Sequence, residues 1–130
     1  MPQTRGALHG RKILVVEDNY LIAEHVRSLL LQEGCDVVGP VAQLAQALKI
    51  VREGGALDGG VLDINLHGKL SFAVAAALAE RSVPFVFLTG YDDRAIIPDE
   101  FAMRPVLTKP LDEAQLIELA AAMFVARPAN

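Results

Sequence analysis

The sequence contains no tryptophan and one cysteine, and aromatic residues make up only 5% of it. The single cysteine, Cys35, excludes an internal disulfide and is typical of a reducing compartment. Because aromatic residues are few, the core must consist mainly of Val, Leu, Ile and Ala. Hydrophobic residues nevertheless make up 52% of the 130 residues, and the mean hydropathy is +0.33. The chain can therefore bury a substantial core.

Basic residues and long apolar runs are also scarce. The 12 Lys and Arg residues face 16 Asp and Glu residues, so the formal net charge is −4. A nucleic-acid surface needs clustered Lys and Arg, and we therefore expect no nucleic-acid partner. No apolar run approaches the roughly 18 residues that a membrane-spanning helix needs, and residues 1–12 lack the apolar core of a signal peptide. We expect a cytoplasmic domain without membrane insertion.

The length of the chain is typical of one domain. We expect this domain to occupy residues 11–126, between an N-terminal tail at residues 1–10 and a C-terminal tail at residues 127–130. No internal repeat or low-complexity tract interrupts the sequence.

Strand-like and helix-like segments alternate five times along the chain. Short β-branched runs bounded by turn residues predict strands, and apolar residues spaced three or four apart predict helices. Strands are expected at residues 12–17, 36–41, 60–63, 84–88 and 106–108, and helices at residues 20–33, 72–80, 111–125 and from residue 44 to the glycines at 54–55. Between the last two strands, Pro98 would break a regular helix, so we expect a short or mobile fourth helix there.

This alternation predicts an α/β fold, in which helices cover both faces of a five-stranded parallel sheet to give three αβα layers. The runs at residues 13–16 and 85–88 do not alternate between apolar and polar residues, which agrees with burial of both faces of the sheet. The flavodoxin-like strand order 2-1-3-4-5 is the natural choice for five such units. It places the last strand, preceded by Pro105, at an edge that tolerates proline.

Polar residues stand where four of these strands end. Glu17 and Asp18 stand at the end of the first strand, Asp63 ends the third, and Thr89 and Lys109 stand at the ends of the fourth and the fifth. The ligand crevice of an open α/β sheet lies beyond the carboxyl ends of its strands, where the strand order reverses, so these side chains should meet. Each one alone is explained by a turn or a helix cap. Together, three acids repel one another unless a cation enters, and Mg²⁺ prefers hard oxygen ligands with a phosphate partner.

The combination predicts that Asp63 is a nucleophile that becomes an aspartyl phosphate. Asp18 would bind Mg²⁺ directly, Glu17 would hold it through water, and the main-chain carbonyl of Asn65 would complete the protein ligands. Mn²⁺ is the alternative metal. The lysine and the threonine would contact the phosphoryl oxygens and stabilise the charge that develops during transfer.

Four motifs, ILVVEDN, VLDINL, FLTG and LTKP, resemble those of the receiver domain of bacterial two-component response regulators, the CheY-like family, in the family's order. The resemblance implies that a sensor histidine kinase or a phosphotransfer protein passes a phosphoryl group to Asp63 with Mg²⁺ bound. The signal would leave through phosphorylation-dependent binding of a downstream protein, or the chain would act as a phosphate sink in a phosphorelay. Catalysis would be limited to self-phosphorylation from a phosphodonor and self-dephosphorylation. The family also implies a cis peptide bond between Lys109 and Pro110.

The residue at the switch position and the motif at residues 87–91 distinguish the chain from typical members of that family. The aromatic switch residue, expected three residues before the lysine, is replaced by Val106. Residues 87–91, FLTGY, resemble the motif of a receiver subgroup with a Phe-Ala-Thr-Gly-Tyr-like sequence, which generally lacks the aromatic switch and is often paired with HWE-type kinases. Tyr91 occupies a position at which the family tunes hydrolysis of the aspartyl phosphate.

The leading hypothesis is a free-standing receiver that is a monomer or a weak dimer. A small phosphatase or phosphotransferase of haloacid-dehalogenase-like type is the alternative. Those enzymes carry a second acid two residues after the nucleophile, where this chain has Asn65. A flavodoxin-like cofactor binder would need a Ser/Thr/Gly-rich loop after the first strand, where the chain reads EDNYL. A receiver that never uses phosphate agrees poorly with a complete catalytic set.

Overall fold

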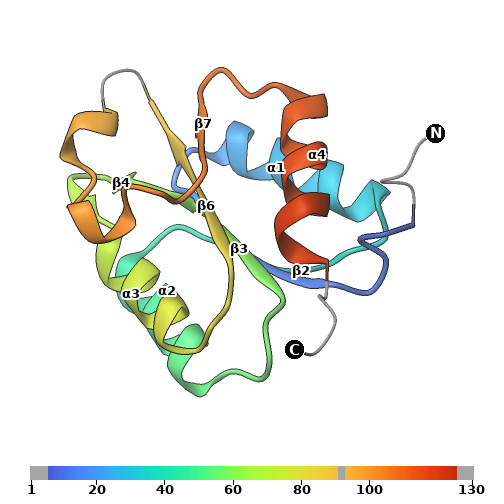
Figure 1. Ribbon diagram of the computed structural model, residues 1–130, viewed down its shortest axis with the longest axis horizontal. Coiled ribbons are helices and arrows are strands. Elements are labelled where there is room, and N and C mark those ends of the chain that lie inside the picture. The colour runs from blue at the N-terminus through green and yellow to red at the C-terminus, as the bar shows by residue number, and fades with distance from the viewer. Residues whose placement is uncertain (1–5, 91–92, 126–130) are drawn as a thin grey trace.

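The computed structural model describes residues 6–90 and 93–125, in which five parallel strands form one sheet with the order β2-β1-β3-β6-β7 (Figure 1). The strands are β1 Lys12–Val16, β2 Asp36–Val41, β3 Gly59–Asp63, β6 Phe85–Thr89 and β7 Val106–Thr108. Counted along the chain, this is the predicted order 2-1-3-4-5, and the flavodoxin-like, CheY-like fold is confirmed.

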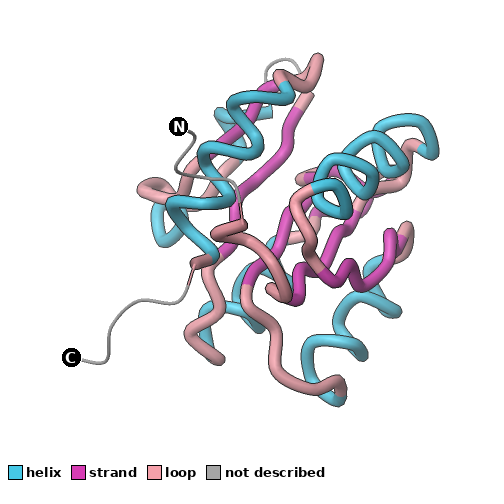
Figure 2. The backbone as a smooth tube through the Cα atoms, turned by 90° about the vertical axis from the view of Figure 1, so that its right-hand side faces the viewer, coloured by secondary structure: helices cyan, strands magenta, loops and turns pink. Residues whose placement is uncertain are grey.

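Four α-helices cover the two faces of the sheet, as the ribbon and the tube seen from the side both show (Figures 1 and 2). They are α1 Tyr20–Gln32, α2 Leu44–Glu53, α3 Phe72–Glu80 and α4 Glu113–Phe124. Helices α1 and α4 pack on one face, and α2 and α3 on the other. Asn19 and Asp112 are the N-cap residues of α1 and α4. Their side chains accept hydrogen bonds from the backbone amides of Ile22 and Gln115, which stabilises the first turn of each helix.

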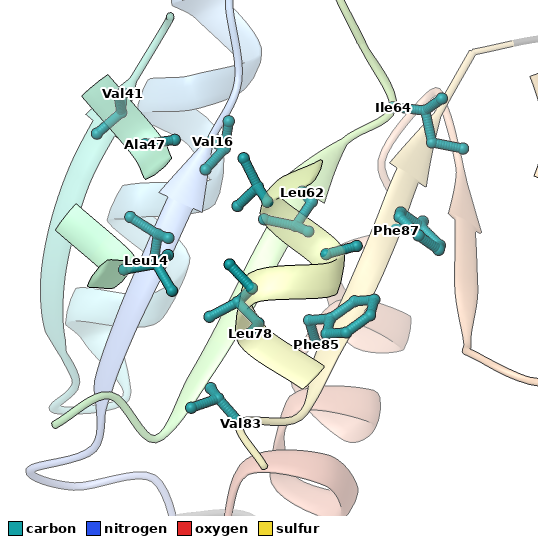
Figure 3. Packing of buried hydrophobic residues seen from close by; sticks show 14 of the residues in the cluster. Leu14, Val16, Val41, Ala47, Leu62, Ile64, Leu78, Val83, Phe85 and Phe87 are labelled. Carbon is teal, nitrogen blue, oxygen red and sulfur yellow. The ribbon is translucent and has the colours of Figure 1, made fainter. Parts of the chain in front are cut away.

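The central strands bury both of their faces because successive side chains point to opposite sides of the sheet. Leu14 and Val16 pack with α2 and α3, whereas Ile13 and Val15 pack with α1 and α4, and all four are fully buried. Figure 3 shows the first of these two layers, with the side chains of β1, β3 and β6 facing α3. The long apolar runs that predicted buried strands are explained by these two cores.

The connection between β6 and β7 contains two short 3₁₀ helices, η1 Asp93–Ile96 and η2 Asp99–Phe101, as expected for a short fourth helix. Pro98 lies at the N-terminal cap of η2. The buried ring of Phe101 lies 6.2, 5.9 and 6.0 Å from the ring centres of Phe72, Phe85 and Phe87, and the Arg104 guanidinium lies 4.5 Å from the centre of the Phe85 ring. Aromatic packing therefore anchors this connection where a full helix is missing.

Two features differ from the sequence-based expectation. Strands β4 Asn65–Leu66 and β5 Lys69–Leu70 form a small antiparallel hairpin directly after β3, where only a loop was expected. Residues 6–10, part of the expected N-terminal tail, form turns against the domain, because Leu8 is fully buried in the core beneath α1 and α4. Residues 1–5 of that tail and the C-terminal tail at 127–130 lie outside the described residues.

None of the helices in the described part of the chain has both the length and the apolar composition needed to cross a membrane.

Gly59 at the start of β3 provides a test of the packing of α4. A Cβ atom at this position would overlap the ring of Phe124, the buried last residue of α4. We expect Gly59→Ala to lower the free energy of unfolding by about 1–3 kcal/mol, the usual cost of overpacking a core, as measured by urea denaturation.

The matched control is Gly55→Ala, because a Cβ atom at Gly55 meets no atom within 4 Å. This control should change the free energy of unfolding by less than about 1 kcal/mol. Equal effects of the two substitutions would contradict the packing of Phe124 against β3.

Candidate functional site

The topology brings together the polar residues that follow the strands. Because β1, β3, β6 and β7 are parallel neighbours, their carboxyl ends lie along the same edge of the sheet. The Lys109 amide donates to the Thr89 carbonyl at 2.8 Å, and the Ile64 amide to the Leu88 carbonyl at 3.2 Å, so ladder-like pairing continues to the site itself. Rigid, buried strands therefore position the site residues.

Three carboxylates meet at this edge. Glu17, Asp18 and Asp63 each place an oxygen within 4.8 Å of the other two. Glu17 and Asp63 are buried, with 2% and 3% of their surface exposed, and Asp18 is half-buried. Neighbouring buried carboxylates repel one another in a medium that screens charge poorly, so the cluster requires positive charge nearby.

Lys109 supplies one positive charge to the cluster. Its Nζ lies 3.2 Å from Glu17 Oε1 and 3.5 Å from Asp63 Oδ1. This one ammonium group contacts two of the three acidic side chains, so a further cation would offset the remaining negative charge of the cluster. Lys109 directly follows the edge strand β7 and contacts Glu17, which follows β1, and Asp63, which ends β3. The sequence predicted this proximity from the parallel order of the strands.

The pKa of Asp63 is raised to about 8, mainly because burial disfavours the charged form, and next because the Glu17 carboxylate lies beside it. The Lys109 ammonium lowers the pKa but only offsets part of this effect. A cation bound among the three acids would favour the ionised form of Asp63, which is the nucleophilic form.

The oxygen donors fit a hard divalent cation such as Mg²⁺. Glu17 Oε1 is buried and has no well-directed hydrogen bond among the described residues, although the Lys109 Nζ lies near it. The other oxygen, Oε2, accepts from the Asn19 amide at 3.0 Å. A buried carboxylate oxygen that lacks a good donor is the kind of group that a metal or its bound water would satisfy.

The loop after Asp63 is held by its own polar groups. The Asn65 amide lies 3.4 Å from Asp63 Oδ1, and Asn65 Oδ1 accepts from the Gly68 amide at 2.7 Å. The Asn65 side chain is therefore engaged in closing the turn of the β4–β5 hairpin. The expectation that the Asn65 main-chain carbonyl binds a metal stays a prediction.

The structure also reveals a contact that the sequence did not predict. His67, at the tip of the hairpin, donates its amide to Asp18 Oδ2 at 2.8 Å, and its Nδ1 lies 2.7 Å from the same oxygen. The two residues are far apart in the sequence, and the strands of the hairpin have two residues each. No periodic pattern could have signalled their proximity.

The remaining predicted site residues have distinct environments. Thr89 is fully buried, and its hydroxyl donates to the Gly90 carbonyl at 3.2 Å. Val106 is half-buried, pairs with Phe87 in the sheet, and packs against the core beneath α2 and α3. The bond between Lys109 and Pro110 is cis. Tyr91 lies outside the described residues.

The chain is similar to several known proteins in sequence and in structure. The sequence profile of the response regulator receiver domain matches residues 13–121. The solution structure of SdrG from Sphingomonas melonis Fr1 is 42% identical, covers 88% of this chain and 96% of SdrG, and gives a TM-score of 0.75. The crystal structure of a receiver protein from Sinorhizobium medicae WSM419 is 27% identical, covers 88% of this chain and 92% of that protein, and gives a TM-score of 0.72.

Two curated transcriptional regulatory proteins are longer than this chain. PdtaR of Mycobacterium tuberculosis is 28% identical over 121 residues, which are 88% of this chain and 58% of PdtaR. BtsR of Salmonella typhi is 32% identical over 107 residues, which are 81% of this chain and 44% of BtsR. The chain thus spans about half the length of these relatives.

A more distant structure supports the fold. The receiver domain of the sensor histidine kinase PA1611 from Pseudomonas aeruginosa PAO1, which has a magnesium ion coordinated in its active-site cleft, is 23% identical. It covers 90% of this chain and 99% of that domain, with a TM-score of 0.77. Receiver domains are generally non-enzymatic signalling domains that interact with histidine kinases or phosphotransfer proteins. With its profile match and its fold, the chain belongs to the response regulator receiver domains of two-component systems.

Proposed function

We propose that the chain receives a phosphoryl group on Asp63 from a sensor histidine kinase or a phosphotransfer protein. The observation that carries the proposal is the position of Asp63, a buried carboxylate at a strand end that lies beside two acids and one lysine. Mg²⁺ would be held by Glu17, Asp18, Asp63 and the main-chain carbonyl of Asn65, and Mn²⁺ would be the substitute.

In the proposed reaction, an Asp63 oxygen attacks the phosphorus of a phosphohistidine. A phosphorus–oxygen bond forms as the phosphorus–nitrogen bond breaks, and the departing imidazole takes a proton from solvent. Lys109, already 3.5 Å from Asp63 Oδ1, would pair with the phosphoryl oxygens. The Thr89 hydroxyl would turn from the Gly90 carbonyl to the phosphoryl group. Bound Mg²⁺ supplies the positive charge that phosphoryl transfer requires.

The metal assignment is supported from two sides. Among the described residues, Lys109 is the one ammonium group that contacts the three converging carboxylates, and His67 contacts Asp18 alone. The receiver domain of PA1611, which has the same fold, holds magnesium in its active-site cleft. Because divalent ions of this type favour oxygen ligands, the same donor set would accept Mn²⁺.

A haloacid-dehalogenase-like phosphatase fits the site less well. That chemistry needs an acid two residues after the nucleophile, and this position holds Asn65, whose side-chain oxygen accepts from the Gly68 amide. An amide that closes a turn offers no proton for a leaving group. The residues of the cluster therefore favour a phosphoacceptor over a hydrolase.

The proposal extends to how the signal is received and passed on. Val106 in place of an aromatic switch and the FLTGY motif support membership of the Phe-Ala-Thr-Gly-Tyr-like subgroup and an HWE-type kinase as the donor. In this proposal Tyr91 tunes hydrolysis of the aspartyl phosphate. The chain would act in the cytoplasm as a free-standing monomer or weak dimer that binds a downstream protein when phosphorylated, or as a phosphate sink.

Phosphorylation is tested by intact mass spectrometry after incubation with acetyl phosphate and Mg²⁺. The wild type should gain one phosphoryl group, and Asp63→Asn should gain none, because an amide oxygen is a poor nucleophile. Chelation of the metal should abolish the gain. Asp36→Asn, an exposed residue at the opposite edge of the sheet, should be phosphorylated like the wild type.

A histidine kinase or phosphotransfer protein should be used as the donor in a parallel reaction. If neither kind of donor labels the folded wild type, or if Asp63→Asn is labelled equally, the proposal is wrong.

The raised pKa of Asp63 predicts a pH-dependent stability of the metal-free protein. Between the ordinary pKa of 3.8 and about 8, the folded state keeps a proton that the unfolded chain releases, so stability falls as the pH rises through this range. Asp63→Asn removes this penalty. In urea denaturation with a chelator, the free energy of unfolding of Asp63→Asn should exceed that of the wild type by about 1–3 kcal/mol near pH 8. Near pH 4 the difference should be much smaller.

A difference between Asp63→Asn and the wild type that stays constant across this pH range would show that Asp63 is not destabilised by its surroundings.

A further inference from the structure

The β4–β5 hairpin has a specific geometry at its tip. His67 and Gly68 form the two-residue loop between the paired residues Leu66 and Lys69, and both loop residues have a positive φ, of 52° and 90°. Two consecutive left-handed residues are typical of a type I′ turn, which matches the twist of the strands that it joins. The tip of the hairpin is therefore a defined structure and not a random loop.

This geometry directs His67 at Asp18. The His67 amide and Nδ1 both contact Asp18 Oδ2, at 2.8 and 2.7 Å. Since Nδ1 can donate in the neutral ring when it carries the hydrogen, the pair of contacts does not require a charged histidine. Both contacts use one oxygen, which leaves Oδ1 of Asp18 available to a metal.

The same hairpin carries Asn65. Its amide lies 3.4 Å from Asp63 Oδ1, and its side chain accepts from the Gly68 amide at the tip. The hairpin thus links the end of β3 to Asp18, which follows β1. Residues that come from two different strands are held in one arrangement by a turn of two residues.

We propose that His67 is a positioning residue, which fixes the Asp18 carboxylate for binding of a divalent cation; this inference rests on the proposed function. Carboxylates that bind metals are usually held by hydrogen bonds from a neighbouring group, and loss of such a group typically weakens metal affinity by about 10–100-fold. The His67 side chain is 76% exposed, so its contribution to the stability of the metal-free fold is small. We therefore expect loss of the His67 side chain to change mainly the affinity for the metal.

The test compares His67→Ala with His67→Asn by isothermal titration calorimetry with MgCl₂ alone. Asn places an amide nitrogen as many bonds from Cα as His Nδ1, and Asn tolerates the left-handed backbone of this position. We expect His67→Ala to weaken the Kd for Mg²⁺ by about tenfold. His67→Asn should remain within about threefold of the wild type. His25→Ala, which removes a histidine paired with Glu113 between α1 and α4, is the control and should bind like the wild type.

A second readout separates positioning from direct participation in phosphoryl transfer. At saturating Mg²⁺, the rate of phosphorylation of His67→Ala by acetyl phosphate should stay within about twofold of the wild type, because only the affinity for the metal is altered. The Tm of the metal-free His67→Ala should stay close to that of the wild type.

Equal or tighter Mg²⁺ binding by His67→Ala would overturn the inference and leave the proposed function intact. The inference would also be overturned if His67→Asn weakened Mg²⁺ binding as much as His67→Ala. A side-chain hydrogen-bond donor at position 67 would then have no effect on the binding of the metal. A wild type that binds no Mg²⁺ would instead overturn the proposed function, and this inference with it.

Discussion

The structure depends on one electrostatic constraint: three carboxylates converge at the carboxyl edge of the sheet, and the contacts described for them provide one ammonium group, that of Lys109. Burial raises the pKa of Asp63, since its charge lies in a medium that solvates it poorly beside another carboxylate. Such a site is costly in the metal-free protein and would become favourable with the proposed cation bound. The cost to folding and the proposed capacity for phosphoryl transfer would then have the same origin.

The rest of the fold keeps this cluster in place. The strands that end at the site are buried on both faces by two apolar cores, so their ends cannot separate to relieve the repulsion. In the connection from β6 to β7, Phe101 of η2 is also held in place, because it packs among three other phenylalanines. In the proposed signalling mechanism, a change at Thr89 would have to reach the surface without an aromatic side chain at the usual switch position, because that position holds Val106.

Much of this arrangement could be predicted from the sequence, because it depends on local patterns. Apolar runs marked the strands, their spacing marked the helices, and parallel topology then required Glu17, Asp63 and Lys109 to meet. Pro98 correctly indicated the lack of a regular helix before β7. These features can be predicted because each depends on residues that are close together in the sequence.

Features that depend on contacts between distant segments could not be predicted. The β4–β5 hairpin has strands too short for a periodic pattern, and only the folded chain brings His67 to Asp18. Leu8 looked like part of a tail because the two apolar residues Ala7 and Leu8 are too few to give a periodic signal, yet Leu8 is fully buried. The raised pKa of Asp63 likewise depends on burial and on Glu17, and not on its immediate sequence.

The central claim is that Asp63 itself carries the phosphoryl group, and the most direct test is to locate the modified residue. Reduction of the phosphorylated wild type with borohydride converts an aspartyl phosphate to homoserine, which peptide mass spectrometry can assign to one position. The account predicts homoserine at position 63 and unmodified Glu17 and Asp18. Modification of either of those acids, or a phosphoryl group on a side chain elsewhere, would contradict it.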